Sequence, residues 1–294
     1  MAFLGMRAGI MNVNFDELRR WIGRSQTQDD TVTPVPVAAL AATLDRDDPL
    51  PQPGDELPPL WHWIYFLPLV RHSELGSDGH PRRGGFLPPV PLPRRMWAGG
   101  RFEFFHPLRV GESIRRTSRI ADVSLKEGRS GTLVFVRVRH EVSNDAGVAL
   151  AEEQDIVYRE APRPGETPPA PKAAPLDAAW HSEIVPDPVL LFRYSALTFN
   201  GHRIHYDHPY TTQVEGYPGL VVHGPLTATL LVDLLRRHLP HVRLERFSFR
   251  AVRPLYAPRP FTVCGKLEAD GKTATLWTRD ADGWVTMEAS ATLA

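Results

Sequence analysis

The chain has 294 residues, of which 42% are hydrophobic and 23% charged, a composition typical of a globular protein with one or two domains. Its 34 Lys and Arg balance its 34 Asp and Glu, so no global field attracts nucleic acid or an anionic membrane. The single cysteine, Cys264, excludes an internal disulfide and fits a reducing cytoplasm, and no apolar run approaches the roughly 20 residues of a membrane helix.

The N-terminal part of the sequence predicts two short helices. Asn14 can cap the first helix, because its side chain can accept from a free N–H of the first turn. The apolar residues that follow share one face of this helix: Phe15, Leu18, Trp21 and Ile22. The second helix is predicted from Pro36 to Leu44. After a proline-rich loop, the almost continuously apolar segment from Trp61 to Leu67 predicts a buried strand.

A long irregular loop is predicted from Arg71 to Gly100. It contains Arg94 and Arg95 close to Trp97. Loops of this length inside a domain are usually functional or mobile. Two interpretations stay open: a solvated loop, or a lid whose arginines and tryptophan contact an anionic ligand.

From Arg101 onward the pattern changes to β-strands. Residues 132–142 alternate, as a half-buried strand does, with one face formed by Val134, Val136, Val138, His140 and Val142. Asn144 to Gly147 predicts a hairpin turn, and a returning strand follows. Residues 161–177 then contain six prolines and predict an extended linker between an N-terminal domain, 1–160, and a C-terminal domain, 178–294.

The second half begins with a predicted helix over 188–198 and contains a strongly apolar helix over 225–238, followed by strands to Leu293. The pattern Phe102-x4-Pro107 recurs as Phe249-x4-Pro254, an offset of 147 residues (254 − 107). This offset suggests a duplicated α+β unit in which an antiparallel sheet wraps a central helix. The first half has no comparable long helix, which would leave room there for a ligand.

Polar chemistry is concentrated in residues 199–224, between the two apolar helices of the second half. This segment holds four of the twelve histidines: His202, His205, His208 and His223. Three of them, with Asp207, offer a metal-ligand alternative. Ligands three residues apart share a face only on a helix, however, and Gly201 and Pro209 bracket the run, so we predict no metal site.

The run from Ala196 to Asp207, ALTFNGHRIHYD, resembles the hydratase motif of MaoC-like, R-specific enoyl-CoA hydratases, A-x-[ST]-x-D-x-N-P-[LIV]-H-x-D. The variant N-x-H-R-I-H-Y-D and the loop FLPPVPLPRRMWAGG resemble a subgroup of these proteins that contains mesaconyl-C4-CoA and itaconyl-CoA hydratases and mitochondrial-type 3-hydroxyacyl thioester dehydratases. The resemblance covers most of residues 80–294. It implies a double hot-dog fold, with the central helix degenerate in the first unit.

The resemblance also implies roles for individual residues. His205 falls on the family's catalytic histidine, and Asn200 falls where the general hydratases carry an aspartate, so the amide is expected to orient water. Asp207 or His202 would assist His205, with Asp207 favoured as the charge that orients a histidine. An oxyanion hole is expected at a helix N-terminus formed by Gly219, His223 and Gly224. The expected substrate-binding residues are Arg203, Tyr206, Arg94, Arg95, Trp97, Arg250 and Arg253.

The implied function is a hydro-lyase that adds water to a short α,β-unsaturated acyl-CoA, with CoA as part of the substrate and no metal or organic cofactor. A C5 dicarboxylic substrate, itaconyl-CoA or mesaconyl-C4-CoA, is favoured. The alternatives are a 3-hydroxyacyl-thioester dehydratase of fatty-acid type, a non-catalytic acyl-CoA-binding protein and a hot-dog thioesterase. A cytoplasmic homodimer without nucleic-acid or membrane partners is expected.

Overall fold

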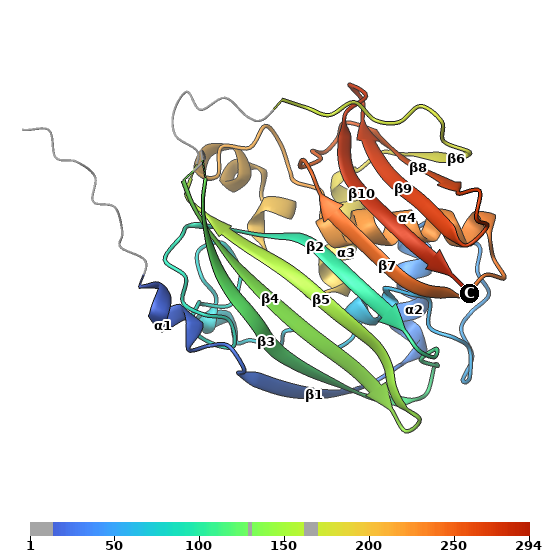
Figure 1. Ribbon diagram of the computed structural model, residues 1–294, viewed down its shortest axis with the longest axis horizontal. Coiled ribbons are helices and arrows are strands. Elements are labelled where there is room, and N and C mark those ends of the chain that lie inside the picture. The colour runs from blue at the N-terminus through green and yellow to red at the C-terminus, as the bar shows by residue number, and fades with distance from the viewer. Residues whose placement is uncertain (1–13, 129–130, 162–169) are drawn as a thin grey trace, which may run out of the picture.

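The computed structural model describes residues 14–128, 131–161 and 170–294, and Figure 1 shows their arrangement. One large antiparallel sheet curves around a single long helix. The α-helices are α1 (Phe15–Arg19), α2 (Pro34–Thr43), α3 (Pro188–Leu197) and α4 (Gly224–His238). Three short 3₁₀ turns, η1 (Trp61–Ile64), η2 (His72–Glu74) and η3 (Arg203–His205), and a π-helical turn, η4 (Tyr210–Val214), lie in the connections.

The sheet contains ten strands in the order β1-β3-β4-β5-β2-β7-β10-β9-β8-β6. Each of the first five strands has a counterpart five strands later at the mirror position of this order. The bounds are β1 (Ser25–Thr31), β2 (Arg94–Phe104), β3 (Ser113–Gly128), β4 (Gly131–Asn144), β5 (Gly147–Arg159), β6 (Trp180–Ile184), β7 (Leu244–Ala251), β8 (Phe261–Leu267), β9 (Thr273–Asp280) and β10 (Val285–Leu293).

The two halves of the sheet meet where β2 pairs with β7. Phe102 lies opposite Phe247, and Gly100 lies opposite Phe249. Glycine is required at this seam, because a Cβ on Gly100 would lie 2.9 Å from the Phe249 ring. The repeat of Phe102 as Phe249, noted in the sequence, therefore corresponds to neighbouring strands at the centre of one continuous sheet. The division into domains at 160 and 178 stays a prediction, and residues 162–169 of the expected linker lie outside the described ranges.

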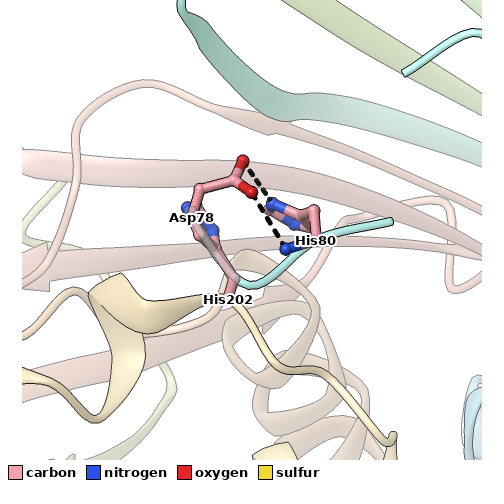
Figure 2. A group of neighbouring side chains, drawn as sticks. All are labelled: Asp78, His80 and His202. Atoms are coloured by element: carbon pink, nitrogen blue, oxygen red, sulfur yellow. Dashed lines mark hydrogen bonds and ion pairs between the residues drawn. The ribbon is translucent and has the colours of Figure 1, made fainter. Parts of the chain in front are cut away.

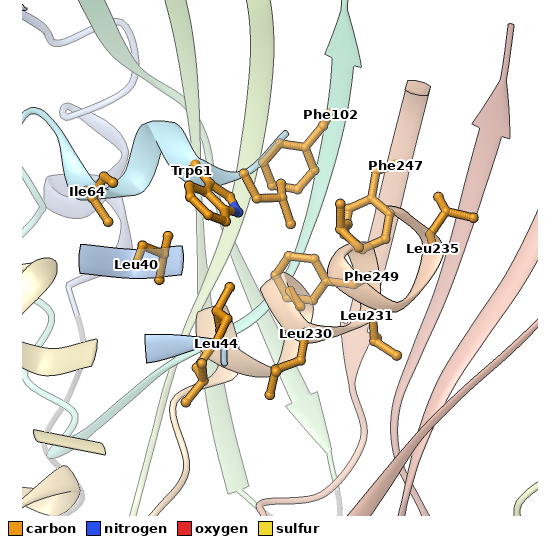
Figure 3. Packing of buried hydrophobic residues seen from close by; sticks show 14 of the residues in the cluster. Leu40, Leu44, Trp61, Ile64, Phe102, Leu230, Leu231, Leu235, Phe247 and Phe249 are labelled. Carbon is orange, nitrogen blue, oxygen red and sulfur yellow. The ribbon is translucent and has the colours of Figure 1, made fainter. Parts of the chain in front are cut away.

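Helix α4 is the central helix that the sequence predicted. Pro225 stands in its first turn, where a missing N–H costs nothing, and Arg236, Arg237 and His238 stand in its last turn. Every residue from Leu226 to Leu235 is buried, and the helix packs against β6, β8, β9 and β10. Figure 3 shows Leu230, Leu231 and Leu235 of this helix facing Phe247 and Phe249 of the sheet. Truncating one such leucine to alanine typically costs about 2–5 kcal/mol.

The first half differs from the prediction at two places. The segment from Trp61 to Leu67, predicted as a buried strand, instead begins with the 3₁₀ turn η1, although Trp61 and Ile64 are buried as expected. A continuous apolar run does not distinguish a strand from a buried turn, because both are covered on all sides. Strand β2 also begins at Arg94, inside the segment predicted as a loop.

Among the described residues, no α-helix lies between α2 and α3, so the first half has no counterpart of α4. The prediction that the central helix is degenerate there is confirmed. The space is not left open, because Trp61 is 1% exposed and packs with Leu40 and Phe102 in the same core cluster (Figure 3). The hairpin at Asn144–Gly147 and the alternation of β4 are confirmed. No helix in the described ranges is long and apolar enough to cross a membrane.

Candidate active site

The polar segment begins where helix α3 ends. Phe199 adopts a left-handed φ of 49°, and the N–H of Asn200 donates to the carbonyl of Ser195 at 2.8 Å, which closes the helix. The side-chain oxygen of Asn200 then accepts from the N–H of His202 at 3.0 Å. This Asx turn leads the chain directly into η3, which carries His205.

His205 is buried, with 7% of its surface exposed, and its ring is fixed on one side by a backbone carbonyl. Its Nδ1 lies 2.7 Å from the oxygen of Val221, and since a carbonyl only accepts, Nδ1 must carry the proton. Nε2 therefore holds the lone pair that a general base needs. Burial lowers the pKa of His205 to about 4, although the bond to Val221 opposes this shift, so the ring is neutral at pH 7.

Two further histidines lie against His205. The ring of His223 stacks on it with centroids 3.6 Å apart, and the ring of His202 meets it edge to face at 5.4 Å. Nε2 of His223 lies 2.8 Å from the Ser195 hydroxyl, whereas its Nδ1 is buried and has no hydrogen-bond partner among the residues that the structure describes. Burial lowers the pKa of both His202 and His223 well below the usual value, and the neighbouring imidazoles add to the effect. Sequence reasoning named both histidines but did not identify Ser195.

The N-terminus of α4 lies at the same place. His223 is its N-cap residue and Gly224 its first residue. The carbonyl oxygen of Trp97, from the other half of the chain, lies 4.0 Å from where a Cβ of Gly224 would stand. That position has room for a Cβ, whereas Gly219 does not, because its Cβ would meet the Ala257 carbonyl at 2.8 Å. N–H groups in the first helical turn have no partner within the helix, so this terminus can stabilise a thioester oxygen as it becomes negative.

Asp207 has other partners than the histidine that the sequence analysis expected. One carboxylate oxygen accepts from the Arg203 guanidinium at 2.7 and 2.9 Å, and the other accepts from the N–H of Tyr210 at 3.0 Å. Arg203 also lies over the Tyr210 ring at 4.0 Å. In this structure Arg203 and Asp207 thus hold the loop after η3, and Asp207 does not orient a histidine.

The carboxylate beside the histidines comes instead from the first half of the chain, from the 71–100 loop, in which sequence reasoning singled out arginines and Trp97 but not Asp78. Asp78 accepts from the backbone N–H of His80 at 3.0 Å, and its other oxygen lies 3.1 Å from Nδ1 of that residue (Figure 2). The His80 ring lies 4.0 Å from the ring of His202. The N–H of Arg203 donates to the Asp78 carbonyl at 2.9 Å, which ties the two loops together.

Gly79 allows the loop that carries Asp78 and His80 to lie against the loop that carries His202. It adopts a left-handed φ of +86°, and an added Cβ would lie 1.9 Å from the carbonyl oxygen of Gly201. The ring nitrogens of His80 and His202 and the carboxylate of Asp78 lie within 4.8 Å of one another, a spacing that a metal ion could use. Because Asp78 and His80 are already bonded to each other, we interpret them as a hydrogen-bonded pair.

The remaining predicted contacts fall into two groups. Arg95 is half-buried near the histidines, and its charge acts on both His80 and His202. Arg94 donates to the carbonyl of Glu215 and lies over Tyr217, and Trp97 bonds through Nε1 to the Gly99 carbonyl. The second group is exposed: Tyr206 at 48%, whose hydroxyl donates to the Gly201 carbonyl at 2.9 Å, Arg250, which pairs with Glu288 at 2.6 Å, and Arg253.

Solved structures with the same architecture come from several organisms. HtdX of Mycobacterium tuberculosis superposes with a TM-score of 0.64 at 22% identity, over 91% of this chain and 99% of that one. A MaoC-like dehydratase from Phytophthora capsici gives 0.63 at 14% identity, over 96% and 99%. A further M. tuberculosis protein, described as having a double hotdog fold, gives 0.56 at 15% identity, over 95% and 98%. The predicted α+β double hot-dog fold is confirmed, so the chain is a double hot-dog protein.

Comparison with related sequences identifies the family to which the chain belongs. The model of the hydroxyacyl-thioester dehydratase type 2 family matches residues 60–257. Mesaconyl-C(4)-CoA hydratase of Chloroflexus aurantiacus is 49% identical over 250 residues, 85% of this chain and 89% of that protein. The mitochondrial hydroxyacyl-thioester dehydratase type 2 of Schizosaccharomyces pombe is 27% identical over 287 residues, 84% and 90% of the two chains. This chain belongs to the hydroxyacyl-thioester dehydratase type 2 family, and the predicted hydro-lyase class is confirmed.

Proposed function

We propose that this enzyme adds water to a short dicarboxylic enoyl-CoA, with mesaconyl-C4-CoA as the preferred substrate and citramalyl-CoA as the product. Itaconyl-CoA is the second candidate of the same chemical class. Relatedness to a mesaconyl-C(4)-CoA hydratase at 49% identity supports this choice. The structural observation that carries it is the position of Arg95.

Arg95 is a half-buried cation close to the histidines. It stands on β2 opposite Tyr158, and its charge acts on His80 and His202. Within the described ranges, no carboxylate lies at ion-pair distance from its guanidinium. In mesaconyl-C4-CoA the second carboxylate is attached to Cβ, the carbon that receives the water. A cation that holds this carboxylate must therefore lie near the general base, and arginine binds carboxylates in a bidentate manner.

The other groups fit the same reaction. Nε2 of His205 takes a proton from water while the water oxygen forms its bond to Cβ. The double-bond electrons move towards the thioester oxygen, where the N-terminus of α4 at Gly224 can stabilise the negative charge. The amide of Asn200 can orient the water, since only its oxygen is bonded to His202. His205 then returns the proton to Cα, which completes the addition without any redox change.

Dehydration of a fatty-acid-type 3-hydroxyacyl thioester is the second candidate, supported by the name of the S. pombe relative. The aromatic packing of the first half favours a short substrate. Trp63 lies 5.1 Å from Trp97 and 5.7 Å from Phe102, so indole rings occupy the region between η1 and the sheet. A long acyl chain would have to displace them. A non-catalytic acyl-CoA-binding protein is the remaining alternative.

The decisive experiment measures the gain or loss of one water by mass spectrometry over a panel of CoA esters. The panel contains mesaconyl-C4-CoA, itaconyl-CoA, crotonyl-CoA and a long-chain 3-hydroxyacyl-CoA. We expect the highest kcat/KM with a dicarboxylic ester. Faster turnover of the long-chain ester would favour the second candidate, and binding without turnover of any ester would favour the third.

The role of Arg95 is tested with a matched variant on the same strand. Arg95→Gln should raise KM for mesaconyl-C4-CoA by about tenfold to hundredfold, the loss expected for one charge-assisted contact of about 1.5–3 kcal/mol. The KM for crotonyl-CoA, which has no second carboxylate, should change little. Arg101→Gln serves as the control, because Arg101 pairs with Asp155 at 2.7 Å on the exposed face. Equal effects on both substrates would contradict the assignment.

We further propose that the reaction needs no metal or organic cofactor, with CoA entering as part of the substrate. Histidine acid–base chemistry supplies both proton transfers, which supports this proposal. A cytoplasmic homodimer stays our prediction for the state of the chain. Light scattering after size exclusion and activity after chelation of metals test the two points.

A further inference from the structure

A row of four imidazole rings crosses the site from one half of the chain to the other. Successive ring centroids are 4.0 Å apart from His80 to His202, 5.4 Å from His202 to His205 and 3.6 Å from His205 to His223. The Ser195 hydroxyl closes one end of the row. A carboxylate closes the other end, and Figure 2 shows it beside the first two rings.

Within the described residues, that carboxylate is the one placed to act on the row. Asn200 stands at the start of the loop that carries His202 and His205, and its amide carries no charge. Asp207 is held by Arg203 and the N–H of Tyr210. Asp78 instead bonds His80 twice, and its negative charge also acts on His202.

We propose that Asp78 is a positioning residue for the hydration reaction. It orients His80 against His202 and supplies, through this row, the negative charge that balances the imidazolium formed transiently on His205. The carboxylate that acts on the histidines of the second half would thus come from the first half of the chain. This inference rests on the proposed hydratase function and extends it.

The proton balance of the reaction shows why a counter-charge is useful. When Nε2 of His205 takes a proton from water, the ring becomes positive in a buried place where its Nδ1 partner is a neutral carbonyl. The developing negative charge lies on the thioester oxygen, on the other side of the substrate. A fixed carboxylate near the row stabilises the imidazolium until the proton passes to Cα. No proton needs to leave Asp78, whose charge is the same before and after turnover.

The other charges around the row support this balance. Burial opposes ionisation of Asp78, but its hydrogen bonds from His80 and the nearby imidazoles lower its pKa below the usual range, so it is negative at pH 7. The cations that act on His80 are Arg95 and Arg83, and Arg95 also acts on His202. Arg83 is fixed by the carbonyls of Val90 and Pro93. A substrate carboxylate bound to Arg95 would neutralise the charge of Arg95. The negative charge of Asp78 would then be free to stabilise the imidazolium.

The test compares Asp78→Asn, which keeps the size and removes the charge, with Asp78→Glu, which keeps the charge. We expect Asp78→Asn to lower kcat about tenfold to hundredfold, equivalent to one or two pKa units at the base, with KM changed by less than about threefold. Asp78→Glu should retain more of kcat than Asp78→Asn. Loss of a negative charge lowers the pKa of the base, so the acidic limb of kcat/KM should move to lower pH in Asp78→Asn.

Asp29→Asn is the matched control, because Asp29 forms an ion pair with Arg115 at 2.6 Å on the exposed strand β1. A kcat within twofold of the unchanged enzyme in Asp78→Asn, or an equal loss in Asp78→Glu, overturns the inference. The inference is also overturned if a chelator abolishes the activity of the unchanged enzyme and added Zn²⁺ restores that of Asp78→Asn. Asp78, His80 and His202 would then be a metal site. If Asp78→Asn does not fold, Asp78→Ser, which also removes the carboxylate, carries the same test with the same expected change in kcat.

Failure of the inference and failure of the proposed function give different results. If the unchanged enzyme hydrates an enoyl-CoA while Asp78→Asn matches it, only the role of Asp78 is wrong. If the unchanged enzyme is folded and hydrates no ester of the panel, the proposed function is wrong and the inference falls with it.

Discussion

The rings of His205 and His223 lie face to face, with centroids 3.6 Å apart and planes only 19° from parallel. Both side chains are buried, and burial lowers the pKa of His205 to about 4 and that of His223 well below its usual value. Two stacked imidazolium ions at this distance would repel strongly in a medium of low dielectric. The stack therefore holds at most one extra proton, which suits a base that takes one proton from water and returns it.

The first prediction concerns His205 itself. His205→Gln keeps a polar side chain of similar size but removes the basic nitrogen, so we expect kcat to fall by about 10²- to 10⁴-fold, the usual contribution of a general base. The rate of enoyl-CoA hydration measures this loss, and circular dichroism checks that the fold is kept. His208→Gln is the control, because His208 is exposed in the same segment and its ring has no partner among the described residues. Full activity in His205→Gln would exclude the assigned base.

The second prediction concerns the stability of the protein in mild acid. Burial lowers the pKa of both His205 and His140 to about 4, whereas an unfolded histidine titrates near 6.5. Between these values the unfolded chain binds protons that the folded chain does not. The contribution of these two histidines to the free energy of unfolding should therefore be constant above about pH 7 and fall as the pH drops from about 6.5 towards 4, by up to ~3 kcal/mol for each.

Urea unfolding at pH 7.5 and pH 5 measures this change, with the slope of the free energy against urea used to check that unfolding stays two-state. Most carboxylates titrate below this window, so the histidines should dominate it. His140→Gln should reduce the difference between the two pH values, whereas the exposed His208→Gln should not. A free energy of unfolding that is the same at both pH values would show that these rings are not buried as neutral groups.

The parts of the fold that the sequence predicted correctly depend on short, regular patterns. Helix α4 follows from a mostly apolar segment between a proline and a cluster of basic residues, and β4 follows from its alternation. The segment after Trp61 was misassigned because apolar residues on every side carry no period that separates a strand from a 3₁₀ turn. Whether this segment forms a strand or a turn depends on the space that the missing helix leaves beneath the sheet. That space is set by the tertiary structure and not by the local sequence.

The site shows the same difference between local patterns, which the sequence reveals, and contacts that only the tertiary structure creates. His205 and Asn200 were identified because they lie in one continuous motif. The pairing of Arg203 with Asp207 was also available from the sequence, since residues four apart are close on a helical turn, and it would have argued against Asp207 as the partner of a histidine. Asp78 was not identified, because it lies over 120 residues before His202 in an irregular loop, and only the tertiary structure brings them together.

The last prediction tests whether the two halves of the chain must meet for activity. Gly79 has a left-handed φ of +86° and no space for a Cβ, which would lie 1.9 Å from the Gly201 carbonyl oxygen. Gly79→Ala should therefore push Asp78 and His80 away from His202 and lower kcat by about tenfold or more, by the same loss of charge at the base. Gly84→Ala is matched to it, because Gly84 has a φ of +89° in the same loop and its nearest neighbour would be 3.7 Å away.

Comparison of the two variants separates backbone strain from steric displacement. Strain alone costs each variant about 1–2 kcal/mol of stability, and the overlap with Gly201 adds a further loss in Gly79→Ala. Both variants should therefore unfold at lower urea concentrations, and Gly79→Ala at the lower of the two. Only Gly79→Ala should lose kcat, because only its methyl group contacts the loop that carries His202. Equal kcat values for the two variants would mean that the close approach of these loops is structural and that the reaction does not depend on the first half of the chain at this point.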